Sequence, residues 1–158
     1  MIVFPNCKIN LGLNIIRKRS DDFHDLETVF YPIPLNDILE MVPAGDQSFG
    51  NDLNFSLSGI SIEANKEDNL CTRAWQLIKN DFPHLPGVRM YLYKNIPTGA
   101  GLGGGSADAV FTLKLLNDLF HLHVSDEQLF DYSLRLRSDC PFFLINQPCF
   151  AAGRGEVL

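Results

Sequence analysis

Five glycines fall within the seven positions from 99 to 105, a density that predicts a loop built to bring backbone amides close to an anion. The full segment reads Pro97-Thr98-Gly99-Ala100-Gly101-Leu102-Gly103-Gly104-Gly105-Ser106-Ala107, and apolar residues at helical spacing follow it. Glycine permits positive φ and has no Cβ, so consecutive N–H groups can form a concave anion site at the start of a helix. We therefore predict that residues 97–107 bind phosphate and that Ser106 can contact a phosphate oxygen or Mg²⁺.

Two familiar glycine motifs fit this loop only in part. Gly99 and Gly104 have the spacing of a Walker A loop, but Gly105 stands where that motif needs lysine, so the lysine has to come from elsewhere. A dinucleotide-binding fingerprint also matches by spacing, yet it requires a buried strand, whereas residues 88–94 alternate like a half-exposed one. A surface linker is disfavoured because linkers do not run directly into an apolar helix.

Lys8 and Asn10 place a cation and an amide side by side on one face of a predicted strand. Apolar residues alternate with them and are expected to face the core: Ile9, Leu11, Leu13 and Ile15. Alternation alone favours a solvated strand face over a functional site. The two alternatives differ in whether this face looks onto the glycine loop.

Asp139 and His24 are two further candidates that the residues alone leave open. Asp139 lies two residues before Pro141, where a turn or cap residue is the ordinary explanation. His24 comes at the mouth of a strand predicted near 29–31, and a lone histidine is more often an ordinary hydrogen-bonding residue than a ligand-binding one. Periodicity does not decide between these alternatives.

Three helices are predicted to support the candidate residues. The helix after the glycine loop, from about 104 to 121, is apolar on more than one side and is expected in the middle of the domain. Asn69 marks the start of a helix at 70–81. Ser125, with a glutamine three residues on, forms a capping box for a helix that ends near residue 136.

Further strands are predicted along the chain before the glycine loop. Pro32 and Pro34 are expected to break the chain before a strand at 38–42. Residues 53–62, with Ser-Gly at their centre, resemble a short hairpin. The strand at 88–94 leads into the glycine loop.

Composition limits the classes of function. The chain has 158 residues, of which 46% are apolar, enough for one domain with a core, and its net charge of −6 argues against binding nucleic-acid polymers or anionic membranes. No apolar stretch reaches the roughly 20 residues of a membrane helix, and residues 1–5 have no features of a signal peptide. The cysteines lie far apart, which suits small buried residues in a reducing cytoplasm: Cys7, Cys71, Cys140 and Cys149.

Three separated stretches, 5–13, 97–109 and 138–143, resemble the three motifs of the GHMP small-molecule kinases. Residues 23–29 and 152–156 are similar to further segments of one branch, whose members act on a cytidine-diphosphate-linked methylerythritol. The resemblance implies an α+β domain with helices packed on a mixed or antiparallel sheet. In such a domain the glycine loop opens a central helix whose N-terminus points at the triphosphate of ATP.

The resemblance also implies roles for individual residues. Residues 97–107 would bind ATP, with Gly101, Gly103, Gly104, Gly105 and Ser106 nearest the phosphates. The other residues expected around the nucleotide are Lys94, Asn65 and Asn69. Asp139 would be the general base, and Lys8 would polarise the acceptor hydroxyl and pair with Asp139. Asn10 and His24 would hold the substrate, His24 against its cytosine.

This chain departs from the family pattern at three places. Cys7 stands where alanine is usual, and Asp22-Phe23 replaces Gly-Tyr before His24. Arg137 replaces a glycine before Ser138-Asp139, and a long side chain there is expected to strain or shift the turn that presents Asp139.

The expected activity is phosphorylation of a hydroxyl on that cytidine-linked substrate, with ATP and Mg²⁺, in isoprenoid precursor synthesis. The alternatives are a kinase for another small alcohol, such as homoserine or mevalonate, and a non-catalytic nucleotide-binding fragment. Residues 1–152 are expected to form the ATP-binding N-terminal domain, and 153–158 to begin a C-terminal domain that this chain lacks. Apolar surface left uncovered by such a domain would favour self-association.

Overall fold

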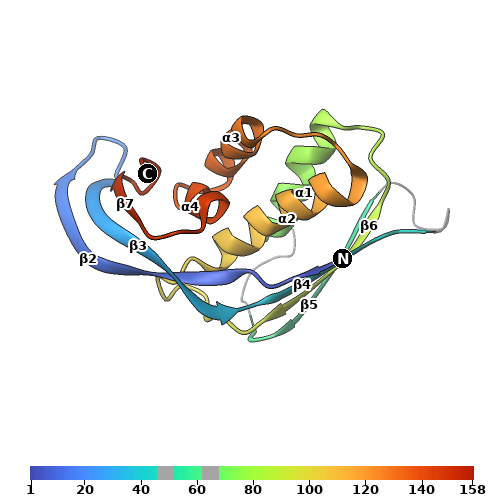
Figure 1. The fold of residues 1–158 in the computed structure, drawn as a ribbon, viewed down its shortest axis with the longest axis horizontal. Helices are drawn as coiled ribbons and strands as arrows, with labels where there is room; N and C mark the ends of the chain where they lie inside the picture. The colour runs from blue at the N-terminus through green and yellow to red at the C-terminus, as the bar shows by residue number, and fades with distance from the viewer. Residues whose placement is uncertain (46–51, 62–67) are drawn as a thin grey trace.

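The chain forms two β-sheets with helices packed together on one side of them, so the α+β expectation is confirmed (Figure 1). The computed structural model describes residues 1–45, 52–61 and 68–158. In chain order the elements are β1 (Ile2–Val3), β2 (Asn6–Lys18), β3 (His24–Asn36), β4 (Ile38–Pro43), β5 (Leu53–Gly59), α1 (Leu70–Asp81), β6 (Val88–Lys94), α2 (Gly104–Phe120), α3 (Asp126–Leu136), α4 (Cys140–Ile145) and β7 (Cys149–Gly153).

The larger sheet has the strand order β1-β4-β6-β5 and is mixed, whereas the smaller sheet, β2-β3-β7, is antiparallel. Strand β6 pairs antiparallel with β4 and parallel with β5. Helix α1 lies in the chain between β5 and β6 and provides the long crossover that a parallel pair requires. The hairpin expected at 53–62 is therefore wrong: β5 pairs with β6, and part of the predicted second strand lies outside the described residues.

Strand β3 passes through Pro32 and Pro34 without a break, contrary to expectation. Its neighbour β7 pairs with it only between Leu26 and Phe30. Beyond Phe30 the β7 side of β3 has no ladder to maintain. Proline lacks an N–H group, and an unpaired strand edge tolerates that loss.

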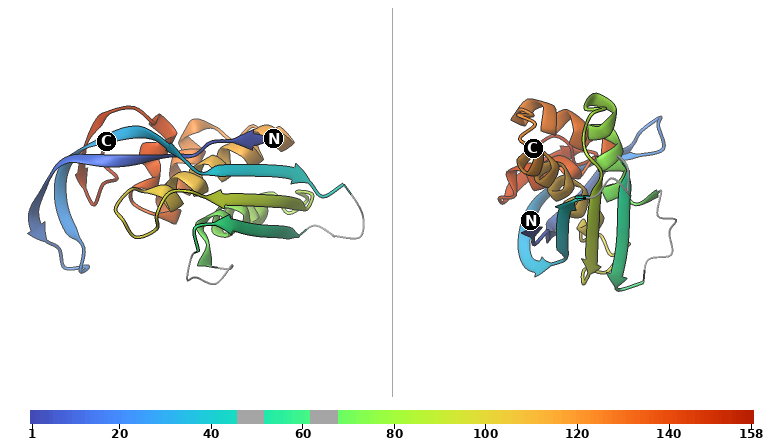
Figure 2. Two further views of the ribbon diagram at one scale, coloured as in Figure 1. Left: turned by 90° about the horizontal axis from the view of Figure 1, so that it is seen from below. Right: turned by 90° about the vertical axis from the view of Figure 1, so that its right-hand side faces the viewer.

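Strands β2 and β3 form a long arm whose tip extends beyond the helices (Figure 2). Leu11, Leu13 and Ile15 were expected in the core, but their exposed fractions are 51%, 54% and 65%. The buried residues of β2 are Cys7 and Lys8, at the end of the strand that the helices cover. Alternation marks a core face only where a second layer is present, and the outer arm has none.

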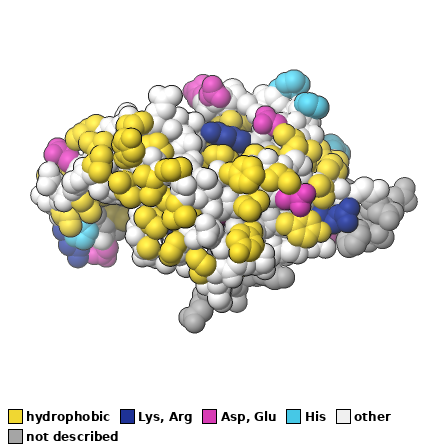
Figure 3. Space-filling view, turned by 60° about the horizontal axis from the view of Figure 1, so that its bottom comes forward, with side chains coloured by type: hydrophobic (Ala, Val, Ile, Leu, Met, Phe, Trp, Pro, Cys, Tyr) yellow, Lys and Arg dark blue, Asp and Glu magenta, His cyan; other side chains and the backbone are white. Residues whose placement is uncertain are grey.

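Hydrophobic side chains cover much of the face on which the strands lie, including the arm (Figure 3). Charged side chains gather toward the tip of the arm in the same view. Contiguous apolar surface of this kind promotes association. Self-association of the chain stays a prediction.

Helix α2 occupies the centre of the fold, and most of its side chains are buried. The caps of the helices beside it confirm the sequence signals. Asn69 accepts a hydrogen bond from the amide of Cys71 (2.9 Å), and Ser125 and Gln128 form both bonds of a capping box. Local sequence thus sets where α1 and α3 begin.

The cysteines are free thiols, and three of them are buried, as expected of small hydrophobic residues. Burial raises the pKa of the Cys140 thiol to about 12, so that this thiol is protonated at neutral pH. Among the helices of the described residues, none combines the length and the apolar character needed to span a membrane.

Candidate active site

The glycine loop presents an uncapped helix N-terminus. Gly99, Gly101 and Gly103 have φ values of 73°, 72° and 70°, in the left-handed region where glycine carries no steric cost. Gly103 is the N-cap of α2, and no side chain caps the helix there. The first amides of α2 are therefore available to a ligand, and the helix dipole favours an anion at this position.

Two of the glycines are also required by packing within the protein. A Cβ on Gly103 would lie 2.9 Å from the ring of Phe143, and one on Gly104 would lie 2.8 Å from the side chain of Ile96. Gly105 differs, because a Cβ there would meet only Leu70, at an ordinary contact distance of 3.7 Å. Substitution at Gly105 therefore changes the cavity without disturbing the core.

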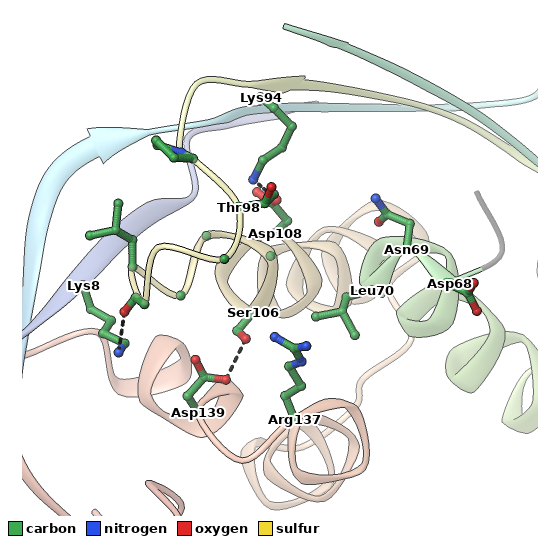
Figure 4. Close-up of a pocket in the computed structure, with 17 residues that line it drawn as sticks. Lys8, Asp68, Asn69, Leu70, Lys94, Thr98, Ser106, Asp108, Arg137 and Asp139 are labelled. Carbon is green, nitrogen blue, oxygen red and sulfur yellow. Dashed lines mark hydrogen bonds and ion pairs between the residues drawn. The ribbon is translucent and has the colours of Figure 1, made fainter. Parts of the chain in front are cut away.

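A cavity of about 470 Å³ opens between the glycine loop, α1 and the turn before α4 (Figure 4), and we call it the glycine-loop cavity. Its volume lies within the roughly 300–1,000 Å³ typical of small-molecule sites. The predicted residues that line it are Lys8, Asn69, Lys94, Pro97, Thr98, Gly99, Gly101, Leu102, Gly103, Gly104, Gly105, Ser106 and Asp139. Two loop residues are not part of this lining, the exposed Ala100 and the buried Ala107. Asn65 lies outside the described residues.

Lys94 is held by two carboxylates beneath the start of α2. Its ammonium forms ion pairs with Asp37 and, at 2.7 Å, with Asp108, and all three side chains are almost fully buried. Asp37 also accepts hydrogen bonds from the amides of Asn95 (2.6 Å) and Ile96 (2.8 Å). The cluster therefore fixes the turn from β6 toward the glycine loop.

Burial raises the pKa of Asp108 to about 7, and the negative charge of Asp37 adds to this effect. The Oδ1 atom of Asp108 is buried and makes no hydrogen bond. With this raised pKa, Asp108 takes up a proton at a higher pH than an ordinary carboxyl group does. Sequence analysis missed both aspartates. The available signal for Asp108 was an acidic residue between two alanines in the first turns of the helix after the loop.

Lys8 lies between the arm and the glycine loop, with only 6% of its surface exposed. Its ammonium donates to Asn10 Oδ1 (2.6 Å) and to the carbonyl oxygen of Gly101 (2.9 Å), and its amide donates to the carbonyl of Leu102 (2.9 Å). This face of β2 therefore looks onto the glycine loop, which decides against a solvated strand face.

The expected ion pair between Lys8 and Asp139 is not formed within 4 Å. The bonds to Asn10 and Gly101 hold the ammonium instead. Desolvation lowers the pKa of Lys8, and the nearby charge of Asp139 opposes that shift. The two groups therefore interact across the cavity without direct contact.

Asp139 is the N-cap residue of α4, but its side chain makes no capping hydrogen bond. Its Oδ1 atom accepts a hydrogen bond from Ser106 Oγ (2.7 Å), which comes from the first turn of α2 (Figure 4). The explanation of Asp139 as a simple cap residue is therefore excluded. Its carboxylate faces the cavity.

A second cavity, of about 590 Å³, lies between the arm and the end of α3, and we call it the arm cavity. Asn10 and Phe23 line it, as does Arg154, which sequence analysis missed. The guanidinium of Arg154 lies 5.2 Å from the ring centre of Phe23. His24 is exposed at the start of β3 and is not among the lining residues, so the structure does not bring it to this cavity.

Among residues 1–45, 52–61 and 68–158, three charged residues line both cavities: Lys8, Arg137 and Asp139. The cavities therefore adjoin at these side chains. Arg137 has φ −159° and ψ 156°, an extended conformation that any residue adopts, so the strain expected there is absent. The turn that presents Asp139 accepts the arginine without a left-handed residue.

The fold and this site define the chain as a GHMP-type kinase domain. Residues 69–152, more than half of the chain, match the family model described as the GHMP kinases N terminal domain. The chain therefore belongs to the GHMP kinase family.

Among curated relatives, the chain is 54% identical to 4-diphosphocytidyl-2-C-methyl-D-erythritol kinase of Bacteroides fragilis and 51% identical to the protein of the same name from Bacteroides thetaiotaomicron. Each match covers 99% of this chain and 56% of the relative, so the chain spans about half the length of the curated relatives it matches.

Solved structures of kinases also resemble this chain. The crystal structure of a 4-(cytidine 5'-diphospho)-2C-methyl-D-erythritol kinase matches with a TM-score of 0.84 and 37% identity, over 100% of this chain and 54% of that one. The Methanococcus jannaschii mevalonate kinase matches with a TM-score of 0.69 and 13% identity, over 98% of this chain and 54% of that one. The second likeness shows a shared fold alone.

Proposed function

We propose that this chain is the ATP-binding part of a kinase that phosphorylates a hydroxyl group of 4-diphosphocytidyl-2-C-methyl-D-erythritol. The observation that carries the proposal is the junction of two cavities at Lys8 and Asp139. A kinase needs one site for the nucleotide and another for the acceptor, with the transferring group between them. The uncapped start of α2 suits the glycine-loop cavity to the nucleotide and leaves the arm cavity for the acceptor.

Asp139 is the proposed general base. Its carboxylate makes no helix-capping hydrogen bond and is oriented by Ser106. It can therefore accept the proton of an acceptor hydroxyl as transfer proceeds. Lys8 is the proposed cation beside the transferring group. Its ammonium is fixed by Asn10 and Gly101 and so requires little reorganisation during the reaction.

The residues of the glycine-loop cavity fit ATP by their chemistry. Backbone amides at the start of α2 can hold phosphate oxygens, and glycine leaves room for their close approach. No cluster of three or more His, Cys, Asp or Glu side chains suited to a metal occurs among the described residues. A hydroxyl oxygen carries two lone pairs, so Ser106 could serve as a ligand. Mg²⁺ bound with the nucleotide would supply neutralisation of phosphate charge.

The choice of acceptor is supported by the names of the curated relatives and of the 37% identical crystal structure. The arm cavity offers the aromatic ring of Phe23, the amide of Asn10 and the guanidinium of Arg154, a set suited to a base and phosphate groups. The role of His24 against cytosine stays a prediction, as do the domain division at residue 152 and a location in the cytoplasm.

The proposal is tested by measuring transfer of radiolabelled phosphate from ATP by the full-length protein. The acceptors are 4-diphosphocytidyl-2-C-methyl-D-erythritol, mevalonate and homoserine, with Asp139→Asn as the matched variant. We expect labelling of the cytidylyl compound alone, and a loss of about 10²-fold or more in kcat for Asp139→Asn with ATP affinity retained. Labelling of mevalonate or homoserine instead would reassign the acceptor, and ATP binding without any transfer would leave only a nucleotide-binding module.

A further inference from the structure

Arg137 stands at the boundary between the two cavities, directly after the last residue of α3. Its side chain points into the glycine-loop cavity, toward Ser106 and beside Asp139 (Figure 4). The resemblance to the family predicted glycine at this position, so a family pattern assigns the arginine no role. Its position nevertheless places a permanent positive charge where the two proposed substrates meet.

The backbone of Arg137 is anchored independently of its side chain. Its amide donates to the carbonyl of Ser133 (3.2 Å), and its carbonyl accepts from the amide of Cys140 (3.2 Å). The extended conformation imposes no requirement for a particular residue. The fold therefore does not depend on the guanidinium.

Among the described residues, Arg137 is also the cation of this cavity whose side-chain N–H groups have no hydrogen-bond or ion-pair partner. Of the residues that the structure describes, three cations and three carboxylates line the cavity: Lys8, Lys94, Arg137, Asp68, Asp108 and Asp139. The ammonium of Lys94 forms two buried ion pairs, and that of Lys8 is held in place by two hydrogen bonds to uncharged oxygens. Within the described part of the chain, the guanidinium of Arg137 makes neither an ion pair nor a hydrogen bond. None of its five N–H donors is therefore used by the residues that the structure describes, and they can bind a ligand.

We infer that Arg137 binds the terminal phosphate of ATP and stabilises the phosphoryl group during its transfer. The inference rests on the proposed kinase function and adds a phosphate-binding residue to it. A guanidinium presents a planar fork that matches two phosphate oxygens, and it is less strongly hydrated than an ammonium. The acceptor's diphosphate offers the same chemistry, but the side chain points toward Ser106 and the start of α2, which favours the nucleotide.

The test compares Arg137→Gln, Arg137→Lys and Arg137→Gly with the parent in the full-length protein. Titration calorimetry with Mg-ATP and Mg-ADP, without acceptor, shows whether the arginine recognises the terminal phosphate. Arg135→Gln is the control, because Arg135 is an exposed cation in the last turn of α3 that lines neither cavity and pairs only weakly with Asp131 (3.9 Å).

We expect Arg137→Gln to weaken ATP binding about ten-fold or more, as for other hydrogen bonds to charged groups, while ADP binding changes less than about three-fold. The kcat is expected to fall with it, while the KM for the acceptor remains unchanged. Arg137→Lys is expected to recover part of the ATP affinity, and Arg135→Gln to match the parent.

Equal losses for ATP and ADP, or a rise confined to the KM of the acceptor, would overturn the assignment to the terminal phosphate. Parent-like binding and kcat in both Arg137→Gln and Arg137→Gly would overturn any phosphate role for Arg137 and leave the kinase function intact. A folded parent protein that binds neither nucleotide would overturn the proposed function, and this inference with it.

Discussion

Ser106 Oγ donates a 2.7 Å hydrogen bond to Asp139 Oδ1, which joins the first turn of α2 to the start of α4. Ser106 is 1% exposed, and Asp139 has no capping bond of its own. The bond therefore fixes the carboxylate relative to the glycine loop. The hydrogen bond thereby holds two side chains that are 33 positions apart in sequence in a defined relative position.

Ser106→Ala should separate this positioning role from stability. Without the hydroxyl, the Asp139 carboxylate loses a charge-assisted hydrogen bond worth roughly 1.5–3 kcal/mol, and we expect kcat to fall about ten-fold or more with a small change in the melting temperature. Ser133→Ala is the matched control, since Ser133 is equally buried and donates to the carbonyl of Phe130 (2.7 Å) away from the cavity. Comparable kcat in both variants would contradict the role of the bond.

Gly105→Ala should stabilise the protein and impair nucleotide binding at the same time. The new methyl group meets only Leu70, at 3.7 Å, and alanine favours a helix over glycine by up to about 1 kcal/mol. The same methyl occupies the side from which phosphate is proposed to approach the amides. We therefore expect a melting temperature equal to or above that of the parent and an ATP affinity about ten-fold lower.

The control for this experiment is Gly103→Ala, which combines a positive φ of 70° with a clash against Phe143 at 2.9 Å. That variant should lose stability as well as affinity, because the ring has to move and the left-handed conformation is strained. Unchanged ATP binding by a stable Gly105→Ala variant would show that the nucleotide does not approach the start of α2.

Local signals predicted the elements that hold the site. Asn69 and Ser125 mark helix starts through their own side chains, and the glycine density marks the loop, so each of these features is encoded within a few residues. Features that depend on a neighbouring element were missed. Pro32 is tolerated because of where β7 ends, and the exposure of Leu13 depends on where the helices end.

In the candidate site, too, local sequence predicted some features, whereas others depend on tertiary structure. Lys8 and Asp139 were left open by the residues and acquired roles through family resemblance. Only tertiary structure shows that Lys8 bonds to Gly101 while Asp139 bonds to Ser106. The strain expected at Arg137 was wrong because the residue is extended, a property that no local pattern in the segment specifies.

The buried cluster of Lys94, Asp37 and Asp108 beneath α2 should make the stability of the protein depend on pH. The folded-state pKa of Asp108, about 7, lies above the ordinary value of 3.8. Between these values the folded protein binds the proton more tightly than the unfolded chain does, so the contribution of this group to stability falls as pH rises from about 4 to about 7. We expect Asp108→Asn to remove that slope, measured as melting temperature against pH.

Asp131→Asn is the control, because Asp131 is an exposed carboxylate of α3. It should leave the slope unchanged. Infrared spectroscopy at pH 6 should also show a protonated carboxyl band that is lost in Asp108→Asn. A slope and a band identical to those of the parent would assign the proton to another group.

Lys8 should set the alkaline limit of activity. Desolvation lowers its pKa below the ordinary 10.5, although the charge of Asp139 opposes the shift. A lysine with a lowered pKa loses its proton at a lower pH, so activity that requires the ammonium is expected to decline before pH 10.5 is reached.

Lys8→Arg keeps the charge with a pKa above about 12, and should move this decline to higher pH even if the longer side chain lowers kcat. Profiles of kcat/KM against pH for the two proteins, with protein stability checked at each pH, measure the effect. An alkaline limb at the same pH in both would mean that a group other than Lys8 controls it.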